Sequence, residues 1–156
     1  MKKLPVFLIV LFFCFLLSFE AKAQSRKSVS GAEVTGTFRD YFDGKRKGSY
    51  DEIKILALGK GKLKISFDLV YPYVDGTGAM SANTGEAAGT AEIVGDTAIF
   101  TPEDSEQCKI TLKFLTGGRL KVTQAGADSD CGFGHNVTAT GDYKKVSSSR
   151  PKFSAQ

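Results

Sequence analysis

Residues 108–115, CKITLKFL, decide the fold class of this chain. Apolar and polar side chains alternate through the segment, with Cys108, Ile110, Leu112 and Phe114 on one face and Lys109, Thr111 and Lys113 on the other. Because successive side chains of a β-strand point to opposite faces, this alternation predicts an antiparallel strand with one buried face. The glycine-rich turn at 116–118 and the alternating segment 119–124 then complete a hairpin.

The same alternation recurs along the chain. Further strands are predicted at 34–39, 52–58, 63–71, 87–94, 97–101 and 136–145. Apolar spacing of 3.6 residues is not sustained over ten or more residues anywhere, so the fold class is all-β. Short glycine-rich connections favour an antiparallel meander of about eight strands. Closure of such a meander into a small barrel removes both exposed edges, and a β-sandwich is the alternative.

Two glycines favour the barrel. Gly36 in the first strand and Gly141 in the last lie where a closing sheet must bend sharply. The inward-facing small residues Ala87, Gly89 and Ala91 would leave room for a small apolar ligand. Six aromatic residues would instead fill the interior: Phe38, Phe67, Tyr71, Phe100, Phe114 and Tyr143.

The N-terminus is typical of an export signal. Lys2 and Lys3 precede an apolar run from 4 to 19, and Ala21-Lys22-Ala23 matches the small-x-small site of a signal peptidase. The run is shorter than the roughly 20 residues of a membrane span, so we expect cleavage after Ala23 and no stable membrane span afterwards, with a retained anchor as the alternative. The protein would then be periplasmic or secreted.

The predicted organisation has four parts. Residues 1–23 form the signal peptide, 24–32 a flexible segment, 33–146 the barrel domain and 147–156 a polar tail. Within the domain, residues 72–86, rich in glycine, alanine and asparagine, are predicted to form a long loop. Loss of the signal lowers the formal net charge from +4 to +2, which is too near neutral to indicate a nucleic-acid partner.

Removal of the signal also leaves two cysteines, Cys108 and Cys131. Exported proteins fold where thiols oxidise, so we expect a disulfide between them. Closing this loop would stabilise the fold by roughly 3 kcal/mol. A pair of metal thiolates is the alternative, but no second cysteine or histidine pair stands at zinc spacing.

Residues 128–137, DSDCGFGHNV, form the chemically densest stretch. The candidate binding residues are Asp128, Asp130, Phe133, His135 and Asn136. The structural interpretation is a turn fixed by the disulfide, with Phe133 covering an end of the barrel. A metal site would use Asp128, Asp130 and His135, yet the other ligands of a calcium loop are missing. His135 as a catalytic base would need a nucleophile beside it. We therefore expect no cofactor, no bound metal and no enzymatic activity.

The C-terminal half carries a resemblance. Cys108, Phe114, Val122, Gln124, the CGFG of 131–134, Val137, Gly141 and Tyr143 follow a spaced C…F…V.Q…CGFG…V…G.Y pattern. Over roughly residues 86–146 this resembles a family of small exported bacterial all-β proteins of uncharacterised function. The general build is similar to lipocalin-like and lysozyme-inhibitor-like barrels. The resemblance implies an exported domain with paired cysteines, and it implies no catalytic residues.

Two functions follow from these expectations. The first is an exported non-enzymatic binding protein that holds a small apolar ligand or an envelope protein at the barrel mouth and loops. The alternative is an envelope-associated interaction or hydrolase-inhibitor protein that uses surface loops or a basic sheet face. That face would consist of Lys109, Lys113, Arg119 and Lys121, although such charges often serve only solubility.

Overall fold

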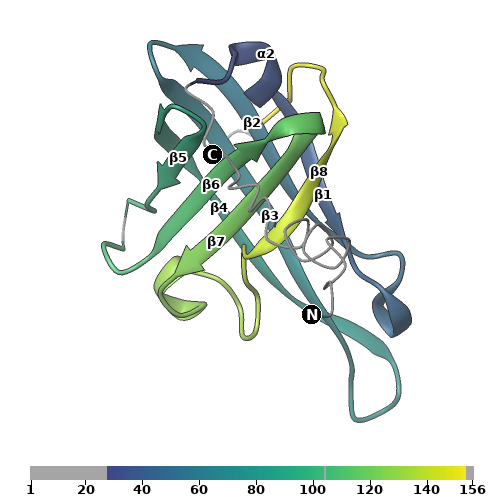
Figure 1. Cartoon of the computed structure of the whole chain (residues 1–156). Helices are drawn as coiled ribbons and strands as arrows, with labels where there is room; N and C mark the ends of the chain where they lie inside the picture. The colour runs from purple at the N-terminus through teal and green to yellow at the C-terminus, as the bar shows by residue number, and fades with distance from the viewer. Residues whose placement is uncertain (1–27, 104, 154–156) are drawn as a thin grey trace, which may run out of the picture.

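The computed structural model describes residues 28–103 and 105–153, and these form a closed antiparallel β-barrel (Figure 1). Eight strands follow one another around the barrel in chain order, and β8 pairs with β1 to close it. The strands are β1 (Gly36–Tyr41), β2 (Tyr50–Gly59), β3 (Lys62–Val74), β4 (Met80–Val94), β5 (Thr97–Phe100), β6 (Lys109–Leu115), β7 (Arg119–Ala125) and β8 (Gly141–Ser147). The predicted all-β meander and its closure into a barrel rather than a sandwich are confirmed.

The helical elements are single turns, namely α2 (Gly31–Val34), η2 (Gly44–Arg46), η3 (Thr116–Gly118) and η4 (Ser129–Cys131). Within the described residues, no helix has the length and apolar character needed to cross a membrane. The predicted signal peptide at 1–23, its cleavage site and residues 24–27 lie outside the described part of the chain.

Side chains fill the interior of the barrel. Tyr143, Phe38, Phe67 and Phe100 are the largest fully buried residues, and the rings of Phe67 and Phe100 lie 5.1 Å apart. A Cβ at Gly89 would stand 3.1 Å from the Phe100 ring. The small residue at this position therefore makes room for Phe100, which occupies the space that a ligand would need beside it.

Both glycines predicted to bend the closing strands lie at the β1–β8 seam. Gly36 has a φ of +149°, and a Cβ there would strike the carbonyl oxygen of Ser147. A Cβ at Gly141 would strike the carboxylate of Asp40 on β1. The register between β1 and β8 also shifts between Thr37 and Phe38. The two glycines thus allow the first and last strands to approach closely.

The prediction of a long loop at 72–86 is wrong. Strands β3 and β4 continue pairing through it, with Pro72 opposite Ala82 and Val74 opposite Met80, and only 75–79 turn. Asp75 holds this turn by accepting hydrogen bonds from the amides of Thr77 (2.8 Å) and Ala79 (3.1 Å). Figure 1 shows the hairpin projecting beyond the barrel. Because most side chains of this projecting hairpin are in contact with solvent, its sequence lacks apolar alternation.

The first and last predicted strands begin earlier than the strands of the structure. The last strand begins at Gly141 rather than at 136, although the alternating Val137 and Ala139 are buried. Residue 34, predicted in the first strand, belongs to the short helix α2. Ser30 and Glu33 cap that helix through reciprocal side-chain bonds, and the amide of Val29 donates to the Gly95 carbonyl. Residues 28–32, assigned to a flexible segment, are thus tied to the barrel.

Candidate functional site

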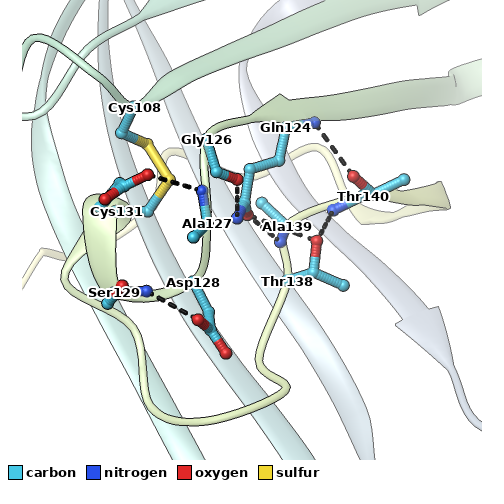
Figure 2. The surroundings of a disulfide bond; sticks show 11 residues. Cys108, Gln124, Gly126, Ala127, Asp128, Ser129, Cys131, Thr138, Ala139 and Thr140 are labelled. Carbon is cyan, nitrogen blue, oxygen red and sulfur yellow. Dashed lines mark hydrogen bonds between the residues drawn. A yellow bond between two sulfur atoms is a disulfide. The ribbon is translucent and has the colours of Figure 1, made fainter.

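The candidate site is the segment 126–140 between β7 and β8, which we name the stapled loop. The predicted disulfide is confirmed: Cys131 in η4 is bonded to Cys108, which directly precedes β6, with 4.9 Å between their Cα atoms (Figure 2). Both cysteines are buried. A covalent link therefore fixes the middle of an irregular segment against the barrel wall.

Two predicted binding residues, Asp128 and Asp130, hold the loop in shape. Asp128 accepts from the amides of Asn136 (2.6 Å) and Ser129 (2.8 Å), and Asp130 accepts from the amide of Ala127 (2.8 Å). The bonds from the Asn136 and Ser129 amides keep the pKa of Asp128 below its usual value. The loop therefore uses these carboxylates as internal acceptors.

Phe133 seals the loop against β4. Its side chain is buried, and a Cβ at Gly85 would stand only 2.7 Å from its ring. Next to it, the Gly134 amide donates to the Thr84 carbonyl (2.9 Å), and the Asn83 side chain donates to the His135 carbonyl (2.7 Å). The loop thus crosses the end of the barrel and anchors on its far wall.

Gln124 replaces backbone pairing that β8 does not supply. Its side-chain oxygen accepts from the Ala139 backbone amide (2.9 Å), and its backbone amide donates to the Thr140 hydroxyl (3.0 Å) (Figure 2). Pairing of β7 with β8 ends at Val122 and Gly141, so Gln124 carries the connection onward. In the sequence Gln124 stands out only as part of a strand and of the C…F…V.Q pattern, because a polar side chain that bonds the backbone of another segment leaves no periodic signal.

His135 and Asn136 remain as the solvent-facing candidates. The His135 side chain is 84% exposed, with its Nδ1 atom 3.9 Å from a carboxylate oxygen of Asp128. Asn136 has a positive φ of 63°, which turns the chain at the tip. Among the described residues, no three histidine, cysteine, aspartate or glutamate side chains gather closely enough to hold a metal ion. The loop presents an imidazole and an amide to the solvent on a fixed backbone.

The predicted basic residues Lys109, Lys113, Arg119 and Lys121 lie on the outer face of β6 and β7. Lys113 stands directly opposite Lys121, and Arg119 stands directly opposite Lys144 of β8. Like charges in directly opposed positions destabilise a sheet. Lys144 extends the face to a third strand, and finding it required the register between β7 and β8.

Two acidic side chains point into the end of the barrel that the stapled loop covers, and they were not predicted as a site. Asp40 on β1 lies opposite Asp51 on β2. Burial raises the pKa of Asp51 to about 7, and burial also raises the pKa of Asp40. Their inward orientation could have been read from strand parity, since Phe38 and Ile53 share their faces.

Fold and site together define a class: a small closed eight-stranded barrel with a filled interior and one end covered by a disulfide-fixed loop. Comparison of the chain with family models, with curated proteins and with solved structures finds no match in any of the three.

Proposed function

We propose that this chain is an exported, non-enzymatic binding protein that holds an envelope protein against the stapled loop. One observation carries the proposal: aromatic side chains fill the interior, whereas the irregular segment at one end is fixed in place. A loop held in one conformation loses little entropy when a partner binds, so rigid loops make efficient contact surfaces. The partner would lie outside the barrel, on the exposed His135 and Asn136.

A protein partner is favoured over a small apolar ligand inside the barrel. Phe100 beside Gly89, and Phe133 beside Gly85, occupy the interior positions that small residues leave free. A ligand would have to displace packed side chains, which is costly at protein packing density. Native mass spectrometry of the purified protein tests this point, since a bound small molecule would appear as a discrete added mass.

We also propose that the protein is not an enzyme. A histidine base needs a nucleophile within hydrogen-bond reach. Cys131 is held in the disulfide, and the carboxylates of Asp128 and Asp130 are engaged by loop amides. These engagements support a structural and binding role for the loop.

The basic face supports a second candidate, an interaction with an anionic envelope component. Lys113 stands opposite Lys121, and Arg119 stands opposite Lys144, so each of these pairs places like charges in direct opposition, which costs stability. Asp142 of β8 stands opposite Lys121 on its other side and offsets part of that cost. An arrangement that costs stability is expected where the charges serve binding. Binding of an anionic component to the basic face would weaken steeply with added salt, unlike binding of a partner through the stapled loop.

Capture from an envelope extract separates the two candidates. The wild-type protein is compared with a loop variant, His135→Ala with Asn136→Gly, and with a face variant, Lys113→Glu with Lys121→Glu. Glycine retains the positive φ of residue 136. Loss of the captured protein with the loop variant alone supports the proposal. Loss with the face variant alone assigns binding to the sheet, and capture unchanged by either variant refutes both.

A further inference from the structure

Strand β4 has an edge that is unpaired along part of its length. The main-chain groups of neighbouring strand residues point to opposite sides, and the Thr84 carbonyl meets the Gly134 amide on the side away from β3. The even-numbered residues of β4 therefore face this side. Pairing with β5 covers 92–94, where Glu92 stands opposite Ile99.

The main-chain groups of Glu86, Ala88 and Thr90 lie between these two covered stretches. Strand β5 ends at Phe100, too early to reach them. Within the described residues, no backbone hydrogen bond joins these three positions to a neighbour on that side. Three residues thus present N–H and C=O groups at strand spacing along an otherwise closed sheet.

A groove of about 490 Å³ lies beside the part of this edge at Glu86 and Ala88, and Thr90 stands just outside its lining. Its lining consists of residues 86–89 of β4, of Pro102, Glu103 and Ser105, and of 129–132 in the stapled loop. A strand face exposes only alternate residues to a groove, whereas an edge exposes consecutive ones. The four consecutive lining residues therefore indicate that the groove follows the strand edge, where main-chain groups are accessible.

The groove is acidic. Glu86, Glu103 and Asp130 line it, and the described residues of the lining include no lysine or arginine. Asp130 uses one oxygen to accept from the Ala127 amide. A segment entering the groove would be favoured if it carried basic side chains, because opposite charges attract strongly near a protein surface. A second copy of this chain would bring the same carboxylates against each other and is disfavoured.

We infer that the edge at Glu86, Ala88 and Thr90 accepts an extended, lysine- or arginine-bearing segment of a partner protein as an added strand. Main-chain hydrogen bonds supply the register of such pairing, and flanking side chains select the sequence. The inference rests on the proposed function, because residues 129–132 of the stapled loop form part of the groove. It adds the chemistry and conformation of the bound segment.

The first test uses a synthetic probe. An acetylated, amidated heptapeptide with alternating lysine and valine is added at roughly 1 mM to the labelled protein, the range suited to a weak complex. We expect the amide protons of Glu86, Ala88 and Thr90 to exchange about tenfold more slowly, and the amides of Ala87 and Gly89 to change little. The same peptide with N-methylated backbone amides should protect them much less, because it has no N–H groups to donate to the β4 carbonyls and its methyl groups hinder close approach to the edge.

Variants of the edge give the second test. Ala88→Pro removes the central N–H at a position where a strand edge tolerates proline, whereas Ala88→Ser retains the N–H. We expect protection to disappear with Ala88→Pro and to persist with Ala88→Ser. Glu86→Lys with Glu103→Lys leaves the backbone intact and should weaken peptide binding about tenfold. This charge variant decides the matter if the proline variant does not fold.

Three results would overturn the added strand: no amide protection in the wild type, protection that survives Ala88→Pro, or peptide-independent dimers that protect the same amides. These outcomes are distinct from failure of the proposed function, which is measured by the His135→Ala with Asn136→Gly variant. Loop-dependent capture without edge protection removes only the added strand. Capture indifferent to the loop removes the proposed function itself.

Discussion

Asp40 and Asp51 lie directly opposite each other on β1 and β2, and each carboxylate accepts a backbone hydrogen bond from a different neighbouring strand. Asp51 accepts from the Val70 amide of β3 (2.8 Å), just beyond the last β2–β3 pair. Asp40 accepts from the Asp142 amide of β8 (3.1 Å), just beyond the last β1–β8 pair. Two side chains thus replace ladder bonds where strands part at the loop end of the barrel.

This arrangement predicts stability that falls as pH rises toward neutrality. The pKa of Asp51 is raised to about 7, chiefly by burial and also by the charges of Asp40 and Asp68, while the Val70 amide and Arg46 oppose the rise. Between about pH 4 and pH 7 the folded state holds a proton that the unfolded state lacks. The free energy of unfolding therefore decreases with rising pH in this window, by up to about 1.4 kcal/mol per pH unit. Urea denaturation at pH 5 and pH 8 measures the difference.

Asp51→Asn should flatten this profile, because asparagine keeps an oxygen acceptor for the Val70 amide without a titrating proton. Asp75→Asn is the matched control. Bonds from the Thr77 hydroxyl and amide lower the pKa of Asp75, so it titrates below the window. Asp40, whose pKa is also raised, should leave a small residual slope in Asp51→Asn. A wild-type protein equally stable at both pH values, or a slope undiminished in Asp51→Asn, would show that Asp51 is not the responsible group.

A second prediction concerns Gly85 and Phe133, which share one space. Gly85→Ala should lower the free energy of unfolding by about 1–3 kcal/mol, because the new methyl group stands within 3 Å of the Phe133 ring. Phe133→Ala alone should cost about 3–5 kcal/mol. The double variant should lose less stability than the sum of the two single variants, because alanine at position 133 leaves room for the methyl group at position 85.

Gly76→Ala serves as the comparison, because nothing lies within 4 Å of a Cβ there and its φ is not positive. Chemical denaturation of the wild type, the two single variants and the double variant completes the double-mutant cycle, and Gly76→Ala is measured beside them. Strictly additive costs would mean that Gly85 and Phe133 do not compete for the same volume.

The third prediction concerns the disulfide. Replacing Cys108 and Cys131 together by alanine should lower the free energy of unfolding by roughly 3 kcal/mol. Amide exchange should accelerate most in the stapled loop and least in β2 and β3, whose pairing does not involve it. Uniform acceleration across the barrel would contradict a local role.

The fourth prediction concerns Lys113. Lys113→Glu should raise the free energy of unfolding by up to about 1 kcal/mol at low salt, because it turns a repulsive pair with Lys121 into an attractive one. The gain should shrink at high salt. Lys109→Glu is the control, since Lys109 stands opposite Ala125. Equal effects from both substitutions would rule out the cross-strand repulsion.

Much of the fold could be predicted because most strands bury one face. Ile65, Phe67 and Leu69 occupy every second position of their strand, and all three are buried in the core as that spacing predicts. The hairpin ends at Val74 and Met80 escaped prediction because both residues are largely exposed, so no apolar face marks the strand.

The site was harder to predict, because its connections depend on register. Two cysteines defined one disulfide, but nothing in the sequence relates Gly85 to Phe133 or Asp40 to Asp142. Val137 and Ala139 alternate as in a strand although neither lies in one: Gln124 binds the Ala139 amide, and the Val137 amide donates to the Gly134 carbonyl within the loop. The unpaired edge of β4 follows from where β5 ends, a property of sheet closure rather than of local sequence.

Site-specific photo-crosslinking in cells that export the protein tests the central claim most directly. A photoreactive phenylalanine analogue replaces His135 in the stapled loop, Lys121 on the basic face or Leu58, which is 51% exposed at the opposite end of the barrel. The account predicts a discrete protein adduct from position 135 and none from position 58. Adducts from position 121 alone, or equal adducts from 58 and 135, would contradict binding at the stapled loop.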